Sequence, residues 1–394
     1  MPHHPQCRQA VAGLAAGALA LTVLAAAGCA AGEDKHQGGE DLVIGASLEL
    51  SGPTASIGTT YRQALELEVD RLNRSGPPGG RKIRLVIRDN KTTPQQNIAN
   101  VKALVEHDKV DALITGACSA CMVPVAPIVE HLKMPTVSLA SASAITEPVT
   151  QRHYTFKISP SPAQDAAVLV SALKQRRIKT IGLINVDNVY GEDGRRSVTQ
   201  RAEAAGIRII SRQRFEQDDQ DMSPQVGKLA EARPDAIVVW AVMPAAGIIA
   251  KNTKDSGYKG GLYLDAGAGA ELFVKGAGTA VAEGTRMVFP RVLAIEDVAD
   301  TSDYVAEQKR WVKDYRDKYG AYSGFASFAA DAARMIADAG ADTDSREALR
   351  DALEKEAFDG LSGRIQNTAE QHSGIQAQSL ALLEVRNGEW HIAR

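Results

Sequence analysis

The sequence lacks the patterns that would indicate nucleic-acid binding or catalysis. Its 394 residues carry a formal net charge of only −3, and lysines and arginines do not cluster with interleaved aromatic residues. Nucleic-acid binding requires a basic surface of that kind, so we exclude this class. No H-E-x-x-H, G-x-S-x-G or G-x-x-x-x-G-K-[ST] motif occurs in the sequence. We therefore expect a protein that is not an enzyme and that uses no metal ion and no cofactor.

Cysteine is also scarce, because the chain has only four. Cys7 and Cys29 lie near the amino terminus, and Cys118 and Cys121 form a single C-x-x-C pair. A zinc site would need a second pair of ligands, which the sequence does not offer. Outside the cytoplasm neighbouring thiols tend to oxidise, so the spacing favours a structural disulfide between Cys118 and Cys121 that closes a small ring. Free thiols and redox chemistry are the alternatives.

Long apolar runs are confined to the amino terminus, where small apolar residues fill positions 11–27. The run ends in Ala26-Ala27-Gly28-Cys29, a layout typical of an export signal. It resembles the bacterial lipoprotein signal, although Ala26 stands where leucine is usual. That resemblance implies that Cys29 is lipidated and becomes the first residue of the mature chain. The alternative is an ordinary signal peptide with an incidental cysteine.

The segment after the export signal differs in composition from the rest of the chain. Residues 1–28 are the expected signal peptide, and residues 29–40 are polar and glycine-containing, as in a flexible tether. No later apolar run is long enough to cross a bilayer. We therefore expect the folded part to be extracytoplasmic, held at the outer face of the cell membrane by a lipid anchor at Cys29.

Strand and helix patterns alternate from residue 42 onward. The expected strands are 42–48, 83–88, 111–115, 135–139, 154–158, 180–185, 207–215, 236–241, 261–264, 364–366, 376–385 and 389–392. The expected helices are 59–73, 94–107, 121–132, 163–174, 190–205, 222–232, 244–256, 302–319, 325–339 and 345–355. This alternation predicts an α/β fold of two doubly wound parallel-sheet lobes. The late helices and strands predict that the chain returns to each lobe, which gives a hinge.

The stretch 111–146 is expected to carry the functional site. It reads as a strand, a glycine turn, a helix, a second strand and another turn of small residues. Turns that follow parallel strands meet at the carboxyl edge of the sheet, where ligands bind. Helix starts at that edge offer free backbone N–H groups to anions. Ser119, Ser141 and Ser143 place hydroxyl groups in these turns, so the sequence predicts a site for the anionic or polar end of a small ligand.

Several short motifs follow one another in the order of a known family. They are Ile44-Gly45, Leu50-Ser51-Gly52, Ala55, Gly58, Asp89, Pro94, Thr115-Gly116-Ala117-Cys118-Ser119, Pro135-Thr136-Val137-Ser138, Tyr190-Gly191 and Pro234-Asp235. With them the chain resembles the type I periplasmic binding proteins of the branched-chain amino acid class, the solute-capturing subunits of ABC importers. The resemblance implies two α/β lobes, three hinge crossovers and a ligand enclosed between the lobes. We place the first lobe at 41–160 plus 290–361 and the second at 161–289 plus 362–394.

The resemblance also implies roles for individual residues. Ser119 and the turn Ala140-Ser141-Ala142 would hold a ligand carboxylate from the first lobe, and Tyr190 would cover the ligand from the second lobe. From the residues alone, two structural roles are open instead. Ser119 can cap a helix, and Tyr190 can pack in the core.

The chain departs from the amino acid binders of that family where the ligand ammonium is expected. Those proteins carry an acidic residue after a strand of the second lobe, and the matching position here is Ala266. A buried ammonium without a carboxylate partner is costly. Either the solute has no ammonium group, or another carboxylate takes over, for which the candidates are Asp265, Glu49 and Asp187.

Together these patterns predict a lipoprotein that captures a small polar solute, an amino acid or a related carboxylate or amide, and delivers it to an ABC permease in the membrane. The alternative is a sensor that binds the same solute and signals to a membrane receptor. The family implies a monomer.

Overall fold

The computed structural model describes residues 41–269 and 271–393. The expected signal peptide, the tether and the lipidation site Cys29 lie outside the described residues. Within residues 41–269 and 271–393, no helix combines the length and the apolar character needed to cross a membrane.

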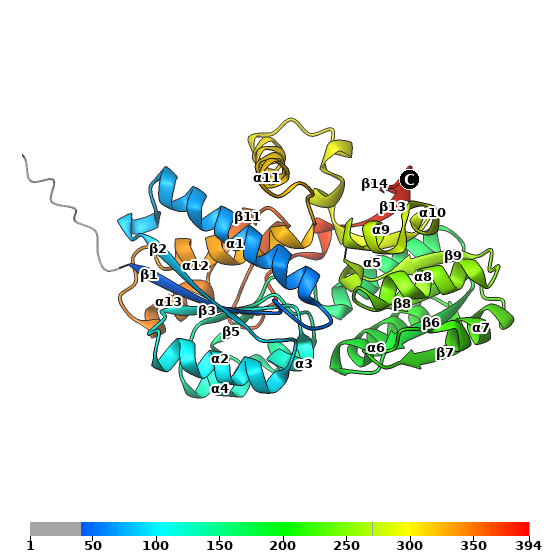
Figure 1. Cartoon of the computed structure of the whole chain (residues 1–394), viewed down its shortest axis with the longest axis horizontal. Coiled ribbons are helices and arrows are strands. Elements are labelled where there is room, and N and C mark those ends of the chain that lie inside the picture. Colours follow the sequence, from blue (N-terminus) through cyan, green and yellow to red (C-terminus); the bar gives the residue numbers. More distant parts are fainter. Residues whose placement is uncertain (1–40, 270, 394) are drawn as a thin grey trace, which may run out of the picture. The chain divides into compact units, whose positions relative to one another are not determined.

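We call the part of the chain that contains the five-stranded sheet the first lobe. All strands of this sheet run parallel (Figure 1). In spatial order its strands are β2 (Ile83–Asp89), β1 (Leu42–Leu48), β3 (Ala112–Thr115), β4 (Thr136–Ser138) and β5 (Thr155–Lys157). The connecting helices are α1 (Ala55–Ser75), α2 (Pro94–Glu106), α3 (Ser119–Met122) and α4 (Ala126–His131). Because β1 pairs with β2 on one side and β3 on the other, the strand order reverses here. The turns after β1 and β3 therefore flank the crevice in which such sheets bind ligands.

The second lobe is built on a seven-stranded sheet (Figure 1). Its parallel strands are β6 (Thr180–Val186), β7 (Arg208–Phe215), β8 (Ala236–Trp240), β9 (Gly261–Leu264) and β10 (Arg286–Pro290). Two antiparallel strands, β13 (Leu380–Arg386) and β14 (Glu389–Ile392), extend the β10 edge. The helices are α5 (Pro162–Gln175), α6 (Val189–Ala204), α7 (Ser223–Glu231), α8 (Ala245–Asp255), α9 (Glu271–Ala277) and α10 (Thr279–Ala282). The expectation of two doubly wound, mainly parallel lobes is confirmed.

The chain crosses between the two lobes through three segments, at 158–161, 291–302 and 367–379. After the second crossing it forms α11 (Asp303–Tyr319), α12 (Phe325–Ala339), α13 (Arg346–Leu353) and a small antiparallel sheet of β11 (Ala357–Gly360) with β12 (Gly363–Gln366). Of these, α12 packs along α1. The residue limits proposed for the lobes stay a prediction.

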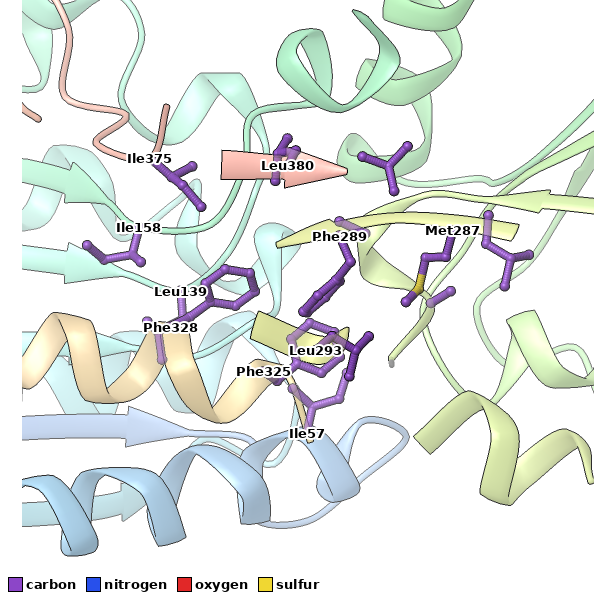
Figure 2. Close-up of a cluster of buried hydrophobic side chains, with 14 of the residues drawn as sticks. Ile57, Leu139, Ile158, Met287, Phe289, Leu293, Phe325, Phe328, Ile375 and Leu380 are labelled. Carbon is purple, nitrogen blue, oxygen red and sulfur yellow. The ribbon is translucent and has the colours of Figure 1, made fainter. Parts of the chain in front are cut away.

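A buried hydrophobic cluster joins the lobes near these crossings (Figure 2). Phe325 and Phe328 of α12 pack against Phe289 of β10, with ring centroids 5.8 Å and 5.6 Å apart. Ile57 of α1 and Leu139, which follows β4, lie around the same rings. Aromatic pairs of this kind add to the gain from burying apolar area. The cluster therefore holds the start of α12 beside both lobes.

Some expected elements differ from those in the structure. The single helix predicted at 121–132 is wrong, because the chain forms two short helices, α3 and α4, separated by a turn. Pro124 and Pro127 explain the interruption, since proline lacks the N–H that would continue the hydrogen bonds of a single helix. The helices α9 and α10 and the strands β10 and β11 were not expected. The strand predicted at 376–385 begins only at Leu380, after a 3₁₀ turn.

Candidate functional site

One cavity lies where the carboxyl edges of both sheets meet α12. The space inside its lining, counted together with the open solvent that it includes, is about 660 Å³. The first lobe contributes Thr54, Ile57, Tyr61, Ala117, Cys118, Ser119, Ala120, Leu139, Ser141, Ser159 and Pro160. The second lobe and α12 contribute Asn188, Tyr190, Gln217, Val242, Ala266, Gly267, Phe325 and Phe328. We call this cavity the pocket.

The glycine turn after β3 is held by a carboxylate of the protein itself. Glu49, at the end of β1, is buried and accepts hydrogen bonds from the backbone N–H groups of Ala117 (3.0 Å) and Cys118 (3.3 Å) and from Nδ2 of Asn90 (2.9 Å). A Cβ at Gly116 would come within 2.0 Å of the Glu49 carboxylate, so only glycine fits there. Burial raises the pKa of the Glu49 carboxyl, while the hydrogen bonds oppose that rise.

The two serine turns of the first lobe meet at the pocket wall. Oγ of Ser119 accepts a hydrogen bond from the backbone N–H of Ala142 (3.2 Å), which leaves its own hydrogen free to donate. Ser119 and Ser141 line the pocket, whereas Ala140 and Ala142 are buried behind the wall. In the part of the chain that the structure describes, the backbone N–H groups of Ser119 and Ala120 have no acceptor. This end of the pocket therefore offers hydroxyl and N–H donors to an anionic group.

The cysteine pair lies at the same turn. The structure pairs Cys118 with Cys121 as a disulfide, with Cα atoms 5.1 Å apart. Cys118 lines the pocket beside Ser119, and Cys121 is buried beneath it. The bond therefore closes the turn that presents Ser119.

The second-lobe wall begins at the start of α6. Asn188 caps this helix, because its side-chain oxygen accepts from the backbone N–H groups of Tyr190 (3.0 Å) and Gly191 (3.1 Å). Its Nδ2 donates to Oε1 of Gln217 (3.1 Å), and both amides line the pocket. The Tyr190 hydroxyl donates to Oδ2 of Asp265. Tyr190 is thus fixed at the pocket wall, while the two amides add polar groups that the sequence analysis missed.

Asp265 lies behind this wall and not in the pocket. It is fully buried, and its carboxylate accepts from the backbone N–H groups of Ala241 (3.0 Å) and Gly267 (2.8 Å) as well as from Tyr190. Burial raises the pKa of Asp265 to about 7. A second buried carboxylate, that of Asp165, accepts from the Ala266 N–H at 2.7 Å. Asp265 therefore positions Tyr190 and has no direct face toward a ligand.

No charged side chain lines the pocket among the described residues. None of the three carboxylates suggested as partners for a ligand ammonium lines the pocket, and that role stays a prediction. Glu49 and Asp265 are enclosed by backbone donors, and Asp187 is exposed with Arg214 at 3.7 Å. An ammonium in this pocket would meet only neutral groups, which is unfavourable for a buried charge.

The remaining wall of the pocket is apolar and aromatic. Phe325 meets the ring of Tyr61 edge-on, at 6.1 Å between centroids, and Ile57, Leu139 and Phe328 complete the wall. The Tyr61 hydroxyl is buried without a partner in the described part of the chain. The sequence analysis missed the phenylalanines because they lie more than 150 residues from the first-lobe turns of the pocket. Their i, i+3 spacing at a helix start was the only local signal.

The described residues contain no group of three or more histidine, cysteine, aspartate or glutamate side chains that could hold a metal ion. The polar groups of the pocket are the donors of the serine turns and the neutral amides of Asn188 and Gln217, and the rest of its wall is apolar and aromatic.

Comparison with known proteins gives consistent results. The sequence profile of a family described as periplasmic binding protein matches residues 41–389. An amino acid binding protein of Pseudomonas aeruginosa is 23% identical over 264 residues, which cover 64% of this chain and 69% of that protein. The leucine-, isoleucine-, valine-, threonine-, and alanine-binding protein of the same organism is 25% identical over 245 residues, which cover 61% of this chain and 64% of that protein. A Leu/Ile/Val-binding protein homolog of Brucella melitensis is 24% identical over 292 residues, or 71% of each.

Solved structures share the whole fold. An extracellular ligand-binding receptor from Rhodopseudomonas palustris superposes with a TM-score of 0.82 at 27% identity, over 90% of this chain and 99% of that one. A branched-chain amino acid transporter substrate binding protein from Streptococcus pneumoniae was solved with isoleucine. It superposes with a TM-score of 0.79 at 22% identity, over 90% of this chain and 99% of that one. A solute binding protein of an ABC transporter from Rhodopseudomonas palustris was solved with 3,4-dihydroxy benzoic acid. It superposes with a TM-score of 0.78 at 19% identity, over 90% of this chain and 95% of that one. At these lower identities the last two show the fold alone.

Proposed function

Because the chain belongs to the periplasmic binding protein family and is therefore a solute-binding protein of the periplasmic type, we propose that its solute is a small carboxylate with an apolar or aromatic body and no ammonium group. The observation that carries this proposal is the uncharged pocket lining, with hydroxyl and N–H donors in the serine turns and aromatic rings elsewhere on the wall.

The two ends of the pocket suit the two parts of such a solute. Hydrogen bonds from neutral donors stabilise a buried carboxylate strongly, because charge-assisted bonds are about twice as strong as neutral ones. The aromatic wall formed by Tyr61, Phe325 and Phe328 favours an apolar body. Related proteins named for amino acids or solved with isoleucine and 3,4-dihydroxy benzoic acid show two ligand classes. The missing carboxylate at Ala266 favours the class without an ammonium group.

A thermal-shift screen tests this proposal directly. The purified protein would be heated with α-amino acids, with the matching acids that lack the amino group, with amides and with aromatic acids. A ligand at a hundredfold excess over Kd stabilises a protein by about 2.7 kcal/mol, which shifts the melting temperature measurably. We expect shifts with acids that lack the ammonium. A shift with α-amino acids and none with their deaminated analogues would overturn the proposed ligand class.

Ser119→Ala is expected to weaken binding of the best acid about tenfold or more. The substitution removes a hydroxyl that can donate to the carboxylate, and hydrogen bonds to charged groups are worth roughly 1.5–3 kcal/mol. Isothermal titration calorimetry would measure the change. Ser143→Ala is a matched control, because Ser143 belongs to the neighbouring turn and does not line the pocket. Equal affinities for the wild type and Ser119→Ala would remove Ser119 from the site.

We also propose that the protein is a lipoprotein that delivers its solute to an ABC permease, with signalling to a membrane receptor as the alternative. The motif that ends at Cys29 supports the anchor, and the Cys118–Cys121 disulfide fits an oxidising location. Cys29→Ser is expected to move the protein from the membrane fraction to the soluble fraction, as read by immunoblotting. An unchanged membrane fraction would reject the anchor. Loss of solute uptake in a strain that lacks the protein would support import over sensing.

A further inference from the structure

Asp193 joins the second lobe to a ligand-binding turn of the first lobe. It lies on α6, three residues after Tyr190, and only 6% of it is exposed. Its Oδ2 accepts a hydrogen bond of 2.7 Å from the backbone N–H of Ser143, in the turn after β4. Asp193 does not line the pocket, although the elements on both sides of the bond do. The bond therefore connects the two walls without touching the space for a ligand.

Each residue of the segment 141–143 is fastened by a different side chain. Nζ of Lys157 donates to the carbonyl oxygen of Ser141 (2.8 Å), and Oγ of Ser119 accepts from the N–H of Ala142 (3.2 Å). Both of those side chains belong to the first lobe. The third contact, from Ser143 to Asp193, is the one that the second lobe supplies. The turn is thus held completely only when α6 lies against it.

Charge adds to this arrangement. Lys157 is fully buried, and its one hydrogen bond from Nζ among the described residues is the bond to Ser141. Burial lowers the pKa of Lys157 to about 8, while the negative charges of Glu147 and Asp193 oppose that fall. Asp193 is therefore a counter-charge that the second lobe brings toward a buried ammonium of the first lobe.

A simple surface role does not account for Asp193. Its Oδ1 also pairs with Arg196 at 3.3 Å, but the Arg196 side chain is 70% exposed. Exposed ion pairs of this kind contribute little stability. The short bond to Ser143 and the burial of the carboxylate instead point to the contact between the lobes.

We propose that Asp193 is a positioning residue that completes the ligand-binding turn from the opposite lobe. This inference rests on the proposed function in assuming that the pocket binds a solute, but it does not depend on the solute's chemical class. With Asp193 in place, the segment 141–143 is fixed and Ser119 and Ser141 keep their geometry. Without it, the turn is free to move and lobe closure is weaker. Because Asp193 does not contact the pocket, its loss is expected to weaken every ligand by a similar factor.

Three variants test the proposal. Asp193→Ala removes both the acceptor and the charge, Asp193→Asn keeps an acceptor oxygen but removes the charge, and Arg196→Ala is the matched control on the same helix. The first measurement is amide hydrogen exchange at Ser143 in the protein without ligand, followed by NMR. We expect Asp193→Ala to speed that exchange at least tenfold, Asp193→Asn to have a smaller effect and Arg196→Ala to have none. Unchanged exchange in Asp193→Ala would overturn the inference.

The second measurement is ligand affinity, with the acids found in the thermal-shift screen as probes. We expect Asp193→Ala to bind them about 10- to 100-fold more weakly, with the same factor for different acids, while its melting temperature falls no further than that of Arg196→Ala. Unchanged affinity in Asp193→Ala would overturn the inference and leave the proposed function intact. If no acid binds the wild type and the exchange at Ser143 still responds as expected, the contact is supported and the proposed ligand class fails.

Discussion

Glu49→Gln is expected to destabilise the protein and to weaken ligand binding at least tenfold. The Glu49 carboxylate accepts three hydrogen bonds, from the N–H groups of Ala117 and Cys118 and from Asn90. An amide has only one acceptor oxygen, so its nitrogen would face at least one of these donors. A buried donor left without an acceptor costs about 1–3 kcal/mol. The turn that carries Ser119 would loosen as a result, and the pocket would lose its carboxylate-binding geometry.

Urea unfolding and calorimetric titration measure the two parts of this prediction. Glu66→Gln is the matched control, because Glu66 is exposed and its ion pair with Arg62, at 3.9 Å, is expected to contribute little. Gly116→Ala should reproduce the loss of affinity by another route, since its Cβ would lie 2.0 Å from the Glu49 carboxylate. If Glu49→Gln bound the ligand as tightly as Glu66→Gln does, Glu49 would not organise the site.

The parts of the site that the sequence predicted are those with local signals. Ser119 and Ser141 each follow a buried strand and stand in a turn of small residues, and parallel strands must end at the same edge of a sheet. Tyr190 was predicted from the resemblance to the type I periplasmic binding proteins, which implies that it covers the ligand from the second lobe. All three side chains line the pocket. Their role as ligand-binding residues stays a prediction.

The parts that the sequence did not predict depend on contacts between distant segments. Phe325 and Phe328 reach the pocket because α12 packs along α1, and no local pattern records that contact. Glu49 and Asp265 were correctly placed near the ends of strands, but their side chains turn toward buried backbone N–H groups and not toward the pocket. Where a carboxylate at the end of a strand points depends on the buried N–H groups around it. Those N–H groups come from turns elsewhere in the chain, so the local sequence does not reveal them.

Ala266→Glu is expected to change the preferred ligand from a simple carboxylate to an α-amino acid. Ala266 lines the second-lobe wall of the pocket beside Tyr190 and Gly267. The substitution places a carboxylate where the amino acid binders of the family carry one, so a ligand ammonium gains a partner. Coupling energies between close charge pairs at a protein interface reach roughly 1.5–7 kcal/mol. We expect the ratio of affinities, α-amino acid over its deaminated analogue, to rise by about 100-fold. Competition titrations of the two ligands would measure it.

Ala266→Gln separates the effect of charge from the effect of size, because it adds a side chain of nearly the same volume without a carboxylate. We expect it to weaken both ligands and to leave their ratio almost unchanged. The buried carboxylates of Asp165 and Asp265 lie close to this position, and burial raises the pKa of both. A third carboxyl beside them is harder to ionise, so the preference for the amino acid should grow as the pH rises. An affinity ratio that is the same in Ala266→Glu and Ala266→Gln at every pH would show that the amino end of a ligand does not face Ala266. In that case the absence of an acidic residue there would no longer argue against an amino acid as the solute.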